Sequence, residues 1–91
     1  MAILVKSDLP ITTDQYDALN SRLQALPGDT FAGCISHACV PTASGLAIYD
    51  LWESEEAMRK FMGIVMPIAQ EMGLPQGARP EIHPTHAHWT P

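Results

Sequence analysis

Hydrophobic residues recur along the chain with two different spacings. Tyr16, Leu19, Leu23 and Leu26 lie three or four residues apart, which predicts one apolar face of a helix. Residues 46–52 alternate between two sets of side chains and are rich in residues that favour strands. The two spacings predict strands over residues 2–7, 31–40, 46–52 and 81–89, and helical regions over residues 13–26 and 55–72.

The first helix has a strong start signal. Thr12 is a good N-cap, and Gln15 stands three residues later, which completes a capping box. Ile11 and Tyr16 are spaced as a hydrophobic staple around this cap. Pro27 and Gly28 then predict the end of the helix.

The second helical region contains a proline. Ser54 is its predicted N-cap, and the apolar face that follows is Met58, Phe61, Met62, Val65, Ala69 and Met72. Pro67 lies inside this pattern and has no backbone N–H to donate. We therefore expect the helix to kink or break over residues 63–66 and to resume at Pro67.

The segment 31–40 contains no charged residue, and both of its alternating faces are small or apolar. This pattern is typical of a strand that is buried on both sides, and we expect the strand to lie in the middle of the sheet. The order β-α-β-β-α-β predicts an α+β, ferredoxin-like fold: a four-stranded antiparallel sheet with both helices on one face. A second copy is the economical cover for the other face, so we expect a homodimer whose two sheets form an α/β barrel.

Composition bounds the class of protein. The chain has 91 residues, enough for a single domain over 1–91, with 46% hydrophobic residues, 16% charged residues and a net charge of −5. This hydrophobicity excludes a disordered tail. The basic residues are few and scattered, which argues against nucleic-acid binding. No apolar run approaches the length of a membrane span, so we expect no membrane partner.

The N-terminus and the cysteines suggest a cytoplasmic location. MAILVKSD has no basic start followed by a long apolar segment, so it does not read as a signal peptide. Cys34 and Cys39 are five residues apart, which on a regular strand places them on opposite faces and too far apart for a disulfide. We interpret them as small apolar residues in a reducing compartment.

Three polar residues are the candidate catalytic groups. His37 lies in an uncharged strand and titrates near neutral pH, so it can act as a base or hold a substrate; otherwise it is a core histidine bonded to Tyr49, Ser36 or a backbone carbonyl. Asp50 alternates with apolar residues and is either functional or part of an ion pair. With His86 from the last strand, these groups would converge on one side of the sheet if the registers align.

Apolar residues between sheet and helices are the candidate pocket walls, although such side chains more often form core or dimer contacts. The predicted substrate-binding residues are Trp52, Tyr49, Phe61, Met62 and Met66. His86 and His88 share a strand face, but no metal motif of recognised spacing is present, so we expect no metal. A phosphate loop and a dinucleotide fingerprint are also lacking, so we expect no cofactor.

The run LAIYDLWESEEAMRKF resembles the antibiotic biosynthesis monooxygenase-like group of dimeric α/β-barrel proteins. Further similarities are His37 in mid-strand before small residues and Pro41, a broken second helix ending in EMGLP, and His86 in the last strand. One departure is His86-Ala87, where members often have His-Asn.

The resemblance implies an enzyme similar to cofactor-independent monooxygenases or cyclases and isomerases, acting on an aromatic or polyketide-like molecule. The alternative is a non-catalytic dimer that binds a small hydrophobic ligand or serves as an accessory subunit.

Overall fold

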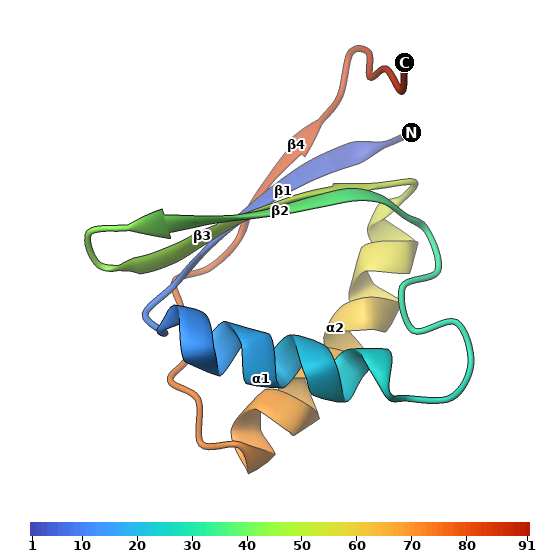
Figure 1. Ribbon diagram of the computed structural model, residues 1–91. Coiled ribbons are helices and arrows are strands. Elements are labelled where there is room, and N and C mark those ends of the chain that lie inside the picture. The colour runs from blue at the N-terminus through green and yellow to red at the C-terminus, as the bar shows by residue number, and fades with distance from the viewer.

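The computed structural model describes residues 1–91 and has the predicted order of elements. Figure 1 shows the strands as one layer with both helices beneath it. The elements are β1 (Ile3–Leu9), α1 (Thr13–Gln24), β2 (Cys34–Thr42), β3 (Gly45–Trp52), α2 (Glu55–Glu71) and β4 (Glu81–Pro84). The ferredoxin-like arrangement is therefore confirmed. Neither helix is long and apolar enough to cross a membrane.

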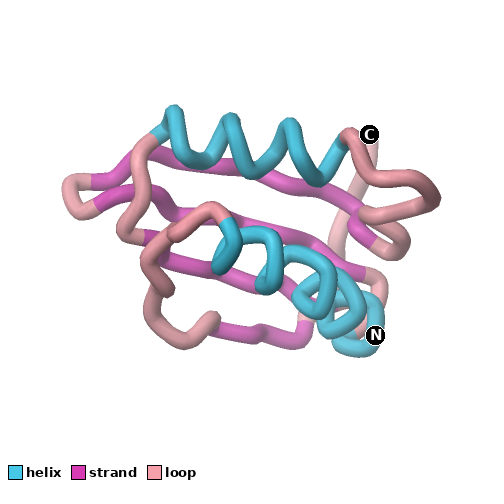
Figure 2. The backbone as a smooth tube through the Cα atoms, turned by 90° about the horizontal axis from the view of Figure 1, so that it is seen from below, coloured by secondary structure: helices cyan, strands magenta, loops and turns pink.

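The four strands pair in the order β2-β3-β1-β4, and every pairing is antiparallel. Seen from below, both helices lie in front of the same face of this sheet (Figure 2). The prediction that the second strand lies in the middle was wrong: β2 is an edge strand, and most of its side chains are exposed in the single chain. The central strands are β3 and β1, because β1 pairs with both β3 and β4.

The core lies between the sheet and α2. Ile3 and Trp52 are paired across β1 and β3, and both are buried together with Val5 and Met58. Trp52 is only 1% exposed. The predicted split of β3 into two faces is confirmed, since Trp52 faces this core and Tyr49 points to the side that no helix covers.

Both helices begin where their caps predict. The Thr12 hydroxyl accepts the backbone N–H of Gln15, and the Gln15 side chain accepts that of Thr12, so the capping box is complete. The Ser54 hydroxyl accepts the N–H of Ala57 at the start of α2.

Of the predicted kink or break in the second helix, the break was wrong, because α2 continues through Pro67. Pro67 removes one donor from the helical ladder and leaves the carbonyl of Gly63 without its partner. Both residues are exposed, so water can satisfy that carbonyl. The helix therefore tolerates the lost hydrogen bond and continues to Glu71.

A β-bulge near the start of β2 changes which side chains share a face. Cys34 pairs with Trp52 and Ser36 pairs with Leu51, so Ile35 is the extra residue. The regular alternation that predicted Cys34 and Cys39 on opposite faces was therefore wrong: both lie on the helix-covered face. Both thiols are free.

The last strand is shorter than its sequence pattern predicts. The pairing of β4 with β1 ends at the pair of Pro84 and Ile3, and β1 begins at Ile3. Thr85 is tied to the carbonyl of Ala2 by its N–H at 3.1 Å and its hydroxyl at 2.9 Å. Residues 86–91 then leave the sheet, so the prediction of a strand through residue 89 was wrong.

Candidate functional site

A continuous chain of hydrogen bonds joins α1, β2 and β3. His37 on β2 and Asp50 on β3 are register partners, and His37 Nδ1 lies 2.5 Å from Asp50 Oδ1. The Tyr16 hydroxyl on α1 lies 2.5 Å from His37 Nε2. The planes of the phenol and the imidazole differ by only 10°. Both ring nitrogens of His37 therefore have a partner.

The register of the sheet explains why these groups meet on the helix-covered face. Asp50 pairs with His37 on one side and with the buried Val5 on the other, so all three side chains point toward the helices. The Asp50 side chain is 15% exposed, whereas that of His37 is 41% exposed. The chain of bonds thus runs from a nearly buried carboxylate to an edge of the sheet that solvent and a ligand can reach.

Asp50 orients the imidazole and favours its charged form. The hydrogen bond to Asp50 raises the pKa of His37, burial opposes that shift, and the negative charge of Asp50 adds to it. In the neutral imidazole, Nδ1–H donates to the carboxylate, so Nε2 carries the lone pair that accepts the Tyr16 proton. This is the arrangement in which a histidine serves as a general base.

The surroundings of Tyr16 keep its hydroxyl protonated. Burial raises the pKa of Tyr16 above its usual value; the Cys39 thiol, once ionised at alkaline pH, and the carboxylates of Asp50 and Asp17 raise it further. Tyr16 therefore offers a proton to His37 Nε2 and does not stand as a phenolate near neutral pH.

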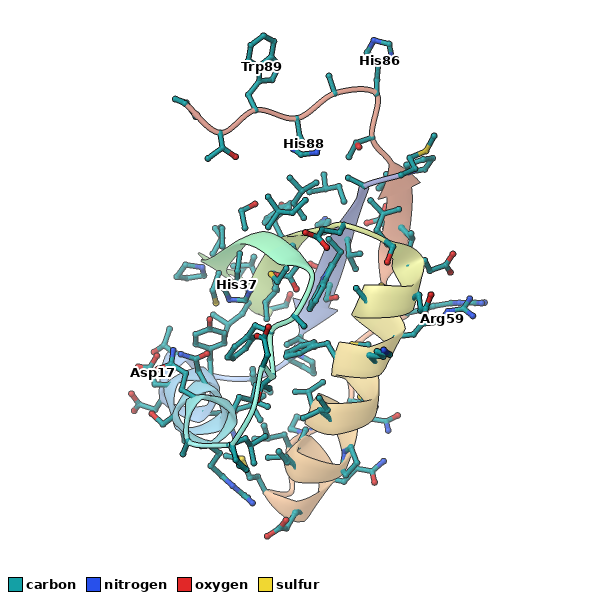
Figure 3. The ribbon with its side chains drawn as sticks, turned by 90° about the vertical axis from the view of Figure 1, so that its right-hand side faces the viewer. Asp17, His37, Arg59, His86, His88 and Trp89 are labelled. Atoms are coloured by element: carbon teal, nitrogen blue, oxygen red, sulfur yellow. The ribbon has the colours of Figure 1, made fainter.

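The structure brings together two of the three predicted catalytic residues. His37 and Asp50 form the bonded pair, but His86 lies beyond β4, at the opposite edge of the sheet from β2. Figure 3 shows His86 on the extended C-terminal segment, well separated from His37. The convergence of His86 with the other two was wrong because the last strand ends before it.

The predicted pocket walls do not surround one space. Trp52 is a core residue whose ring packs at a tilt against Phe61 with ring centroids 5.2 Å apart, and Met62 packs against the same core. Met66 is partly exposed on α2. Tyr49 pairs with Ala38 and Lys6 on the uncovered face, so it cannot line a pocket on the helix side.

Two hollows on the surface are wide open to solvent, and both lie away from the bonded chain. One has a volume of about 440 Å³ and is lined by Glu55, Glu56, Arg59 and Lys60. The other, of about 320 Å³, is lined by Leu26, Pro27, Asp29, Thr30 and Ile64. Neither includes a member of the hydrogen-bonded chain. The structure gathers no three histidine, cysteine or acidic side chains in a position to hold a metal ion.

Tyr16 is the functional candidate that the sequence pattern missed. The spacing of apolar residues places Tyr16 in the apolar stripe of the first helix and in the staple with Ile11, which is itself buried. The available signal was its hydroxyl, since the other members of that stripe are leucines. A hydroxyl that faces a sheet needs a hydrogen-bond partner, and the nearest polar side chain is His37.

No protein-family model and no curated protein matches the sequence. Several solved structures do match in fold. A proposed antibiotic biosynthesis monooxygenase from Chloroflexus aurantiacus aligns over 98% of both chains, with 17% identity and a TM-score of 0.63. Rv0793 from Mycobacterium tuberculosis aligns over 99% of this chain and 100% of its own, with 18% identity and a TM-score of 0.64.

SnoaB from Streptomyces nogalater is a cofactor-independent oxygenase. It aligns over 96% of this chain and 93% of its own, with 12% identity and a TM-score of 0.60. At such identities the likeness concerns the backbone arrangement. The chain therefore has the fold of the antibiotic biosynthesis monooxygenase-like proteins.

Proposed function

We propose that this protein is a small-molecule enzyme of the cofactor-independent monooxygenase or cyclase kind, acting on an aromatic or polyketide-like substrate. The observation that carries the proposal is the His37–Asp50 pair on the helix-covered face of the sheet. The shared fold with SnoaB, a cofactor-independent oxygenase, supports the general kind of chemistry.

The proposed reaction begins with a proton transfer. A phenol or enol of the substrate is deprotonated, the His37 imidazole gains a proton, and Asp50 stabilises the imidazolium that forms. The electron-rich, carbanion-like anion left on the substrate then reacts with oxygen itself. This role needs an uncharged imidazole, so the raised pKa of His37 shifts the pH range in which it can act as a base upward from that of an ordinary histidine.

The alternative is a non-catalytic protein that binds a small hydrophobic ligand. The specific observation in its favour is that the His37 side chain is 41% exposed in the single chain and lies outside the two open hollows described above. Catalysis by desolvated groups needs a site that excludes water.

A second copy of the chain is the proposed cover for the open face of the sheet. Leu4, Val40 and Tyr49 are partly exposed there, and a pair of such faces would bury them together. We also place the protein in the cytoplasm, a proposal supported by its two free thiols.

Oxygen uptake with a panel of polycyclic phenols and hydroquinones tests the function. We expect uptake with the wild type, and a loss of about a hundredfold or more in His37→Gln, which keeps a polar side chain without a base. Circular dichroism checks that the variant is folded. Tight binding of panel members without any turnover by the wild type would favour the binding protein.

A further inference from the structure

The bonding of His37 leaves no ring nitrogen free for a substrate. Nδ1 is bonded to Asp50 and Nε2 to the Tyr16 hydroxyl, each at 2.5 Å. A neutral imidazole has one donor and one acceptor nitrogen, and both are engaged here. A substrate could give its proton directly to His37 only after displacing the phenol.

The Tyr16 oxygen, by contrast, still has capacity. A phenol has one O–H to donate and lone pairs with which to accept. Its hydrogen is used by His37 Nε2, so a lone pair remains for a second partner. The hydrogen bond between Tyr16 and His37 is at an exposed position, so a ligand can approach this oxygen.

We propose that Tyr16 is the group that takes the proton from the substrate and that His37, oriented by Asp50, acts behind it. This inference rests on the proposed function, because it assumes a substrate with an acidic phenol or enol hydroxyl. The proton balance is simple: the substrate O–H gives its proton to Tyr16 Oη while the Tyr16 proton passes to His37 Nε2. The products are a substrate anion that accepts a hydrogen bond from Tyr16 and an imidazolium paired with Asp50.

The local structure holds Tyr16 in place for this role. It stands in the first turns of α1, directly after a complete capping box on Thr12. Its ring is nearly parallel to the plane of His37, so the hydroxyl hydrogen can point along the Nε2 lone pair. The raised pKa of Tyr16 disfavours a stored phenolate, so the two proton transfers must be coupled.

The experiment uses 2-naphthol, whose neutral and ionised forms differ in absorption and fluorescence. Binding to the wild type should produce the naphtholate spectrum at a pH where free naphthol is neutral. Tyr16→Phe should still bind the probe, with a Kd within about tenfold of the wild type because one hydrogen bond is lost. Its naphtholate signal should fall by about tenfold or more.

The two models of the base predict opposite results for Tyr16→Phe. If His37 took the proton directly, removing the phenol hydroxyl would uncover Nε2 and preserve or increase the naphtholate signal. That result would overturn the relay. The matched control is Tyr49→Phe, the same change on the uncovered face of the sheet, which should leave the signal unchanged.

Failure of the proposed function gives a different result. Absence of naphtholate from the wild type, or its persistence in His37→Gln, contradicts the function. The ¹⁵N signals of His37 then decide the relay. The relay is supported if Nε2 of the neutral wild-type imidazole is unprotonated and accepts a hydrogen bond, and if that hydrogen bond disappears in Tyr16→Phe. A protonated Nε2 in the neutral wild-type ring overturns it.

Discussion

Replacing Trp52 with phenylalanine tests whether Trp52 is a core residue or part of a pocket wall. Trp52 is 1% exposed and contacts the core formed by Ile3, Val5 and Met58. The change removes about 40 Å³ of side chain, and at about 24 cal/mol per Å³ the remaining cavity costs about 1 kcal/mol. Loss of about 40 Å² of buried apolar surface adds about 1 kcal/mol. We therefore expect the free energy of unfolding to fall by about 2 kcal/mol.

The same substitution at Trp89 is the control. Trp89 is 88% exposed on the C-terminal segment, so Trp89→Phe should change the free energy of unfolding by less than about 0.5 kcal/mol. Urea unfolding followed by far-UV circular dichroism, at one protein concentration, measures both variants. An alanine at position 52 is less informative, because its cost of about 3–5 kcal/mol approaches the stability of a small domain.

Two results would refute the burial argument for Trp52. One is a cost no larger than that of Trp89→Phe at an unchanged m value. The other is normal stability together with weakened binding of an aromatic ligand, which would restore Trp52 to the pocket wall.

Asp50→Asn should lower the raised pKa of His37 and weaken the protein most at acid pH. Because the pKa of His37 is higher in the folded than in the unfolded protein, the Asp50 contact stabilises the folded state fully at a pH below the ordinary histidine pKa. That stabilisation disappears as the pH rises through the pKa of His37 in the folded protein. Urea unfolding at about pH 6 and pH 9 should therefore show the larger loss at pH 6. Gly45→Ala should be more destabilising than Gly28→Ala in the same assay, because a Cβ at Gly45 would lie 2.1 Å from a β1 carbonyl, whereas nothing lies within 4 Å at Gly28. Thr12→Ala should cost about 1 kcal/mol through the lost N-cap, and an unchanged stability would contradict the capping box.

Local signals predicted the elements well because they depend on neighbours in sequence. Thr12 and Gln15 cap the first helix wherever that helix lies in the fold, and both bonds are present. The alternation along residues 46–52 likewise sorted the side chains of β3 into two faces. Pro67 was a local signal that failed, because the prediction did not include the exposure of the neighbouring turn.

The errors in the sheet arise from pairings between distant segments. The absence of charge over residues 31–40 indicated that this strand is buried. It could not show whether the strand is covered by other strands of the same chain or by another molecule. Ile35 was not recognisable as a bulge, since the extra residue is defined only against β3. His86 was expected in the last strand, but that strand ends at Pro84, which pairs with Ile3, the first residue of β1.

The candidate site shows the same division between local and distant information. His37 and Asp50 could be selected because each is a polar residue in an apolar strand, and the hairpin of β2 and β3 then sets them opposite each other. Tyr16 needs the path of α1 across the sheet, which no local pattern encodes. Yet the proposed relay depends on Tyr16, since its hydroxyl is bonded to the nitrogen of His37 that accepts a proton in the neutral ring. A tyrosine in an otherwise aliphatic helix stripe therefore merits a search for the acceptor of its hydroxyl before it is assigned to the core.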